Sequence, residues 1–311
     1  MRLTELLNKD EVTISCELFP PKQGAQLENY KNIVKDMAAL KPAYMSVTYG
    51  ATGGTSDYTV KLAEEVRNNN IPALAHLTCA SSTREKVASV IEELKAANIE
   101  NILALRGDIP ANADFPLPDQ YKHASELIAD IKAQGDFCIG GACYPEGHPE
   151  AATIFEDLDH LKEKVDAGCE FLTTQMFFDN NILYNFMYKA LKKGIDVPVV
   201  AGIMPVTNAS QIKRITSLSG NMVPPRFLAI VDRFGDNPAA MRQAGIAYAT
   251  EQIIDRFGSD PAAMKQAGIA YATDQIIDLI ANGVNHVHIY TMNKPDVAGE
   301  ILDNLSNIYV R

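Results

Sequence analysis

Short apolar runs alternate with amphipathic stretches along almost the whole chain. The runs are rich in β-branched and aromatic residues, which is typical of β-strands. The stretches between them place apolar residues three or four positions apart, which is typical of helices packed on one face. Strands are therefore expected at residues 12–19, 44–50, 73–79, 101–108, 137–145, 171–178, 197–206 and 286–293. Helices are expected at residues 28–41, 57–69, 83–98, 123–135, 153–168, 182–194, 208–219 and 295–305.

Eight strands separated by helices, within 311 residues, predict an α/β fold. The expected architecture is a (β/α)8 TIM barrel formed by a single domain of residues 1–311. A doubly wound open sheet is the alternative. It is less favoured, because no expected strand is followed by a G-x-G-x-x-G sequence and the "GATGG" of residues 50–54 has a different spacing.

A tandem repeat interrupts this alternation before the last strand. Residues 232–254 and 255–277 are identical at 19 of 23 positions. Two copies are too few for a solenoid, so a local duplication of a helical segment within the barrel is expected. Ile269, Ala272, Ile276 and Ile280 form an apolar helical stripe leading into the last strand. We therefore expect the second copy in the usual place of the helix before strand eight. The first copy is expected as an extra helix, either on the periphery or in a partner interface, separated from the second by a break around residues 257–260.

Composition narrows the class of protein. Hydrophobic residues make up 47% of the chain, and the net charge of −11 argues against a nucleic-acid partner, because phosphate binding needs a basic surface. No apolar run reaches the ~20 residues of a membrane span, and the first residues become acidic too early for a signal peptide. The five cysteines form no C-x-x-C pair. We therefore expect a cytoplasmic protein with reduced thiols and no metal site, membrane contact or nucleic-acid partner.

One acid, Glu17, lies inside the first expected strand, in the sequence "SCELFPPKQG". Alternation along a strand puts Ser15 and Glu17 on one face and Cys16 and Leu18 on the other. Pro20 ends the strand shortly after Glu17, because proline cannot donate to a sheet ladder. The simplest interpretation is a solvated carboxylate on an edge strand. In a closed barrel, the same residue can instead point into the interior.

Polar residues also follow the other expected strands. In a (β/α)8 barrel the active site forms at the C-terminal ends of the strands. Here these ends carry Thr48 and Tyr49, His76 and Thr78, "ALRGD", "CYPEGHPE", "TTQMFFD" and "YTMNK". Each has an ordinary structural alternative, such as a buried hydrogen-bonded histidine or a loop ion pair. A metal site through His148 and nearby acids is disfavoured, because no partner ligand lies at helical spacing. Together, polar strand ends on one rim predict a functional site.

Nine motifs give the chain a family resemblance. They are "ELFPPK", "SVTYGA", "HLTC", "ALRGD", "YPEGHPEA", "LKEKVDAG", "TQMFFD", "GIMPV" and "HIYTMNK", in this order over nearly the whole chain. On these motifs the chain resembles the methylenetetrahydrofolate reductases, in the short form that has only the catalytic barrel. The resemblance implies a homo-oligomeric barrel that binds FAD non-covalently and takes electrons from NADH or NADPH. It implies a folate substrate, 5,10-methylenetetrahydrofolate, reduced to 5-methyltetrahydrofolate with ping-pong kinetics.

The resemblance also implies roles for the residues that match the motifs. Glu17 would be the general acid, Asp108 would act beside the flavin, and Thr48 and Gln175 would contact the nicotinamide. The folate positions fall on Asp108, Gln175, Gln211 and Lys294. The flavin positions fall on Tyr49, Ala51, His76, Arg106, Gly107, Asp108, Ala124, Tyr144, His148, Ala151, Asp157, His160 and Lys164.

Two of these positions depart from the family pattern. His160 stands where an Asn commonly contacts the cofactor. Lys294 stands where an Arg can pair with the folate tail, so the charge is retained but the bidentate fork is not.

The folate chemistry explains why a buried acid is needed. Protonation of one nitrogen of methylenetetrahydrofolate opens its ring to an iminium ion, which can accept a hydride. Glu17 must therefore carry a proton near neutral pH, and burial favours the neutral form of a carboxyl group. Asp108, placed beside a reduced flavin, would make that flavin a stronger reductant by charge repulsion.

Three alternatives remain for the function. They are another flavin barrel such as a proline dehydrogenase, a folate-binding barrel without flavin that serves a methyltransferase, and a non-catalytic relative damaged by the duplication. Bound flavin, with absorbance near ~450 nm, would separate the flavin enzymes from the other two classes.

Overall fold

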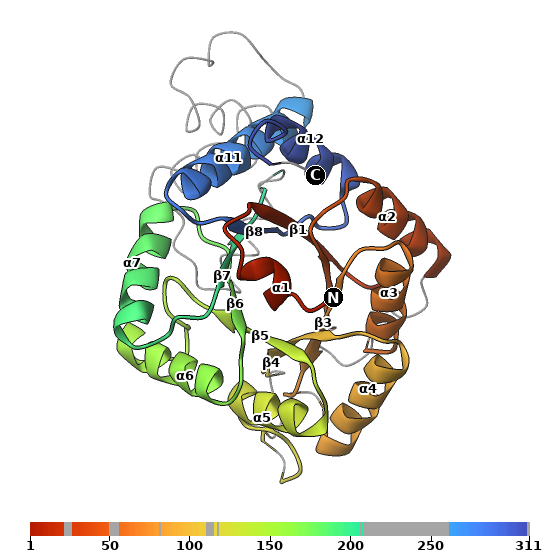
Figure 1. Cartoon of the computed structure of the whole chain (residues 1–311), viewed down its shortest axis with the longest axis vertical. Helices are drawn as coiled ribbons and strands as arrows, with labels where there is room; N and C mark the ends of the chain where they lie inside the picture. The colour runs from red at the N-terminus through yellow and green to blue at the C-terminus, as the bar shows by residue number, and fades with distance from the viewer. Residues whose placement is uncertain are drawn as a thin grey trace.

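The chain folds into a closed barrel of parallel strands surrounded by helices, as predicted (Figure 1). The computed structural model describes residues 1–21, 27–49, 56–80, 82–109, 115–116, 118–205, 207 and 261–309. The strands follow chain order around the barrel, and the last pairs with the first. They are β1 (Thr13–Leu18), β2 (Met45–Val47), β3 (Ala73–Thr78), β4 (Asn101–Leu105), β5 (Cys138–Cys143), β6 (Phe171–Thr174), β7 (Val199–Ile203) and β8 (His286–Ile289). The helices are α1 (Thr4–Leu7), α2 (Leu27–Ala39), α3 (Ser56–Asn68), α4 (Arg84–Ala96), α5 (Ala124–Gln134), α6 (Ile154–Asp166), α7 (Asn180–Lys192), α11 (Pro261–Ala281) and α12 (Pro295–Asn304).

Most strands end earlier than the apolar pattern predicts. The strand expected at residues 171–178 is paired only over β6, and the strand expected at residues 286–293 only over β8. The residues beyond these points leave the ladder and continue as loops over the C-terminal rim of the barrel. The polar ends that predicted a site therefore lie in loops or within the last three residues of a strand.

Among the described residues, two apolar clusters can be distinguished in the core. Ile14, Cys16 and Leu18 of β1 belong to the large cluster between the barrel wall and the helices. A separate cluster fills the N-terminal end of the barrel interior, where Leu3 and Leu7 of α1 are buried. Its other members are Tyr44, Leu74, Leu103, Cys138, Phe171 and Val200. Figure 1 shows α1, which the sequence did not predict, inside the ring of strands. This helix closes the N-terminal end of the barrel.

The second copy of the repeat, residues 255–277, supplies most of helix α11, which the structure describes over Pro261–Ala281. The helix packs against α7 and α12 in the outer ring (Figure 1), and Ile269, Ala272 and Ile276 are buried. These contacts cover the predicted apolar stripe, so this copy takes the usual place before β8. The first copy, residues 232–254, and the helix expected at residues 208–219 lie outside the described residues.

The composition led us to expect reduced thiols and no membrane-spanning segment. All five cysteines are free and buried, and burial raises the pKa of Cys16 and Cys79 to about 12. These two are therefore protonated core thiols at neutral pH. None of the helices in the described part of the chain combines the length and apolar character that a membrane crossing needs.

Candidate functional site

A cavity of about 940 Å³ opens at the C-terminal ends of the strands. Its volume lies at the upper end of the ~300–1,000 Å³ range of ligand pockets. Each strand contributes to the wall, from its last residues or from the loop that follows. The sequence-predicted residues in the wall are Glu17, Thr48, Tyr49, His76, Arg106, Gly107, Asp108, Ala124, Tyr144, His148, Lys164 and Gln175. The structure thus brings most of the predicted site together.

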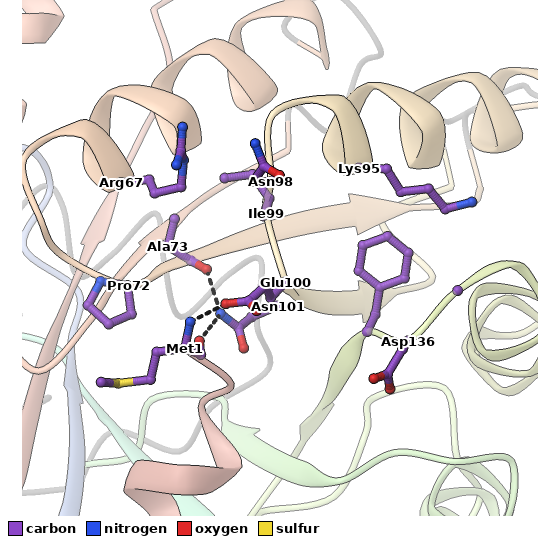
Figure 2. Close-up of a pocket in the computed structure, with 12 residues that line it drawn as sticks. Met1, Arg67, Pro72, Ala73, Lys95, Asn98, Ile99, Glu100, Asn101 and Asp136 are labelled. Carbon is purple, nitrogen blue, oxygen red and sulfur yellow. Dashed lines mark hydrogen bonds and ion pairs between the residues drawn. The ribbon is translucent and has the colours of Figure 1, made fainter.

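Another cavity, of about 700 Å³, lies at the opposite end of the barrel beside Met1 and Asn101 (Figure 2). The Asn101 side chain donates to the carbonyl oxygens of Met1 and Ala73, at 3.2 and 3.0 Å, and accepts from the amide of Leu3 at 2.8 Å. These bonds attach the segment before α1 to the barrel. None of the sequence-predicted site residues that the structure describes lines this cavity. The N-terminal face of such barrels usually serves stability. The C-terminal cavity is therefore the candidate site.

Glu17 lines the cavity from β1 and is 5% exposed, which excludes the solvated edge-strand alternative. Its Oε2 atom lies 3.8 Å from Nε2 of His76 and 3.9 Å from Nε2 of His288. Both separations are too long for hydrogen bonds. The carboxyl group therefore occupies a buried corner between two imidazole rings without bonding to either.

The loop after β8 fixes the backbone around Glu17. The hydroxyl of Thr291 donates to the carbonyl oxygen of Glu17 at 2.6 Å. The side chain of Asn293 accepts from the amide of Phe19 at 2.8 Å and donates to its carbonyl at 2.9 Å. Asn293 has a φ of 58°, a left-handed conformation that Asn adopts more readily than most residues. This clamp, together with the prolines after Phe19, holds the end of β1 in place.

His288 faces Glu17 from β8 in a fixed orientation. Its Nδ1 atom lies 2.7 Å from Oγ of Ser15, and its Nε2 atom lies 3.0 Å from Oγ of Ser46. Oγ of Ser15 also lies 3.0 Å from the carbonyl oxygen of Val287. These contacts on both ring nitrogens hold the imidazole with Nε2 toward Glu17.

His76 is neutral at physiological pH. Burial lowers the pKa of this imidazole to about 4, although the Glu17 carboxylate opposes the shift. The ring therefore offers Glu17 no positive charge, and the two residues do not form an ion pair at neutral pH.

The lowered pKa of His76 makes stability depend on pH. An ordinary histidine in the unfolded chain binds a proton near ~6.5, so between about pH 6.5 and pH 4 the unfolded state binds more protons than the folded state. The free energy of unfolding must then fall as the pH falls. We expect the wild type to lose roughly 3 kcal/mol more than His76→Gln over this range. Urea unfolding near both ends of the range measures this, and equal losses in the two proteins would contradict it.

Two cations stand at the rim of the cavity. Lys164 reaches in from α6, its Nζ donates to the carbonyl of Ala142 at 2.7 Å, and burial lowers its pKa. Arg106 follows β4, and its guanidinium makes two bonds of 2.6 Å to the carboxylate of Glu150. These hydrogen bonds raise the pKa of Arg106. Arg and Lys are the residue types that bind phosphate groups.

Three buried polar atoms in the cavity wall have no hydrogen-bond partner within the described part of the chain. They are Nε2 of His76, Oγ1 of Thr78 and Oγ1 of Thr173. Such atoms are rare in folded proteins, so a bound molecule is their natural partner. Gly107, with a φ of 82°, also keeps space open, because a Cβ there would lie 3.0 Å from Cβ of Thr78. The volume, the unpartnered atoms and the rim cations fit a large ligand with a phosphate-bearing part, such as FAD.

Some predicted contact residues lie outside the cavity wall: Ala151, Asp157, His160 and Lys294. Asp157 is buried and bonds to the backbone of His148, so it supports the wall indirectly. His160 is exposed. Lys294 is also exposed, and its Nζ donates to Oγ1 of Thr207 at 3.0 Å. The predicted residues Ala51 and Gln211 lie outside the described residues.

The sequence analysis placed the end of the last strand, "YTMNK", at the site but assigned no role to His288 or Tyr290. His288 and Tyr290 line the cavity, and the Tyr290 hydroxyl donates to the carbonyl of Thr174 at 2.6 Å. Burial raises the pKa of Tyr290 well above its usual value, so this hydroxyl stays protonated. The alternation along "HIYT", residues 288–291, places the rings of His288 and Tyr290 on one face of the strand, and this pattern could have identified them. Only the pairing of Ser15 with His288 across the barrel closure shows that this face meets Glu17.

The comparisons with known proteins show the family to which this chain belongs. The family model described as methylenetetrahydrofolate reductase matches residues 2–258 and 252–306. The chain belongs to the methylenetetrahydrofolate reductase family. A 5,10-methylenetetrahydrofolate reductase of Pectobacterium carotovorum subsp. carotovorum is 32% identical, with 94% of this chain and 90% of that protein covered. The protein of the same name from Escherichia coli K12 is 32% identical, with 95% and 91% covered.

Relatives differ from this chain in length. A maize protein named methylenetetrahydrofolate reductase (NADH) 1 is 33% identical over 99% of this chain, but the chain spans 50% of the maize protein. The two reductase-family matches overlap at residues 252–258, within the tandem repeat. This overlap agrees with one copy of the repeat being additional to the family pattern.

A solved structure supports the fold. A protein from Clostridium thermocellum, described as binding two copies of 5-methyl-5,6,7,8-tetrahydrofolic acid, aligns with a TM-score of 0.58 at 13% identity and covers 99% of both chains. At 13% identity, this likeness shows that the two proteins share a fold and nothing further.

Proposed function

We propose that this protein reduces 5,10-methylenetetrahydrofolate to 5-methyltetrahydrofolate, with non-covalently bound FAD and with NADH or NADPH as the reductant. Membership of the reductase family supports the folate reaction. One observation supports the placement of the site: Glu17 is a buried acid in the wall of the C-terminal cavity, where this reaction needs a proton donor.

Glu17 would donate a proton from its carboxyl group to a ring nitrogen of the folate. The clamp by Thr291 and Asn293 keeps the backbone of Glu17 in one place, so the carboxyl group can move only by side-chain rotation. His76 and His288 limit that rotation from two sides. When bound, FAD would supply hydride transfer between the nicotinamide and the folate.

Gln175 is oriented to meet a ligand. Its Oε1 atom accepts from the amide of Met176 at 2.9 Å, which leaves its NH2 group to donate into the cavity. We propose that the nicotinamide and the folate contact this group in turn, and that this sharing produces ping-pong kinetics. Thr48 lines the same cavity and would meet the nicotinamide.

Arg106 and Lys164 would hold the diphosphate of the cofactor, because both line the cavity and both carry a positive charge. His148 lies next to them at the rim, where its ring packs edge-on against Tyr144 with centroids 4.6 Å apart. This arrangement leaves the inner part of the cavity, near Glu17, for the reacting rings.

The proposal is tested by reconstitution. Purified protein incubated with FAD and passed through a desalting column should retain absorbance near ~450 nm. Anaerobic NADH or NADPH should bleach the bound flavin, and methylenetetrahydrofolate should restore its colour. Binding of folate without retention of flavin would support the flavin-free alternative. Flavin that is bleached but not restored by folate would support a different flavin barrel.

Asp108 gives a further prediction. The residue lines the cavity but is exposed, so solvent screens its effect on a nearby charge. Asp108→Asn should raise the midpoint potential of bound flavin by about 20 mV or less, the equivalent of an exposed charge interaction. It should also weaken folate binding about tenfold, because a charged acceptor is lost. Asp136→Asn, at the opposite end of the barrel, is the control. A lowered potential would show that the repulsion argument is wrong.

A further inference from the structure

Glu150 is an acidic residue of the rim to which neither the sequence nor the family comparison assigns a role. It lies in the loop between β5 and α6, in the "YPEGHPE" sequence. Its two carboxylate oxygens accept bonds of 2.6 Å from Nη1 and Nη2 of Arg106. This end-on, bidentate arrangement uses the fork of the guanidinium that also matches a phosphate group. A phosphate-bearing ligand at Arg106 must therefore compete with Glu150 for Nη1 and Nη2 or bind another edge of the guanidinium group.

The two partners differ in exposure. The Arg106 side chain is 22% exposed and lies in the cavity wall, whereas the Glu150 side chain is 57% exposed. The carboxylate can therefore turn into water without leaving a buried charge behind. The arginine has less freedom, because its Nε donates to the carbonyl of Gly107 at 3.4 Å.

The backbone at Glu150 is fixed separately from its side chain. The amide of Glu150 donates to Nδ1 of His148 at 3.1 Å, and the His148 ring packs against Tyr144. Exchange of the carboxylate for a phosphate would then require rotation of one side chain and no change in the loop. While Glu150 is paired with Arg106, it neutralises the positive charge of that arginine. Of the two cations that we place at the rim, only Lys164 then has no acidic partner among the ion pairs of the described residues.

We propose that Glu150 is an internal competitor for the anionic group that binds at Arg106, so that a diphosphate-bearing ligand must displace it from the guanidinium fork. The ligand class is a dinucleotide diphosphate, and this choice of ligand rests on the proposed use of FAD. Glu150 would therefore weaken binding of the cofactor.

The test compares the wild type with Glu150→Gln, which keeps the size of the side chain and removes its charge. The apoproteins are titrated with FAD at constant ionic strength, and binding is followed by quenching of flavin fluorescence. The dissociation constant should fall about two- to fivefold, as expected when an exposed ion pair no longer competes. Glu92→Gln, which removes one exposed charge that pairs with Lys95 on α4, should leave the constant unchanged.

Repeating the substitution in an Arg106→Lys variant isolates the interaction between Arg106 and Glu150. In Arg106→Lys the fork is absent, so adding Glu150→Gln should change FAD binding less than it does in the wild type. An unchanged or weaker affinity of Glu150→Gln for FAD would overturn the proposal and show that Glu150 instead aims Arg106 at the ligand.

Inorganic pyrophosphate is the second probe, measured by calorimetry on the same apoproteins. If the wild type takes up no FAD, the proposed function fails. The role of Glu150 is then decided by pyrophosphate, which should bind more tightly to Glu150→Gln than to the wild type. Equal binding of pyrophosphate to both proteins would in that case overturn the inference.

Discussion

Glu17→Gln should lower the rate of folate reduction by at least the ~10²–10⁴-fold that is typical of a lost general acid. The amide keeps the shape of the side chain but cannot supply the proton that opens the folate ring. Flavin binding and reduction of the flavin by nicotinamide should stay near wild-type levels, because neither step needs this proton. Rapid-mixing measurements of the two half-reactions separate these effects.

The control for this substitution is Glu11→Gln, which makes the same chemical change at an exposed position just before β1. It should leave both half-reactions unchanged. Normal folate turnover in Glu17→Gln would exclude the proposed role. Loss of both half-reactions together would indicate that the amide disturbs the cavity itself.

Gly202→Ala should destabilise the fold by about 3 kcal/mol or more, because overpacking and a lost hydrogen bond act together. A Cβ on Gly202 of β7 would lie 2.4 Å from the carbonyl oxygen of Thr174 and 2.6 Å from the hydroxyl of Tyr290. These two atoms form a hydrogen bond of 2.6 Å, and the Gly202 amide itself donates to the Thr174 hydroxyl at 2.8 Å. The methyl group would therefore force β6 and β7 apart or displace Tyr290 from the cavity wall.

Gly299→Ala in α12 is the matched control. A Cβ there would lie 3.4 Å from the nearest atom, at the end of the Leu40 side chain. Replacing glycine by alanine inside a helix gains roughly 0.5–1 kcal/mol, so this variant should be as stable as the wild type or slightly more stable. Urea unfolding compares the two variants. Equal stability of Gly202→Ala and the wild type would show that the strands accommodate the methyl group.

The sequence predicted the barrel and the end of the barrel at which the cavity opens, because both follow from local patterns. Strand residues alternate between faces, so the position of Glu17 within "TISCEL" decides that it shares a face with Ser15. Polar residues at strand ends gather on one rim in any parallel barrel. These two rules bring Glu17, His76, Arg106 and Gln175 to one cavity without knowledge of the helices.

The remaining features are contacts between residues far apart in the sequence, and no local pattern specifies such contacts. The bonds from Thr291 and Asn293 to the end of β1 join residues 274 positions apart, and they exist because β8 closes the barrel against β1. The pairing of Arg106 with Glu150 spans 44 positions. Helix α1 was missed for a different reason: it is a four-residue helix, too short to show a period.

Helix α1 closes the barrel interior at its N-terminal end. Leu3 and Leu7 fill this end together with Phe171 and Val200, and the described cavity beside Glu17 opens at the other end. Among the described residues, side chains thus fill the N-terminal end of the barrel. We therefore expect a ligand of Glu17 to enter and leave at the C-terminal end, so that a second ligand can reach Glu17 from there only after the first has left.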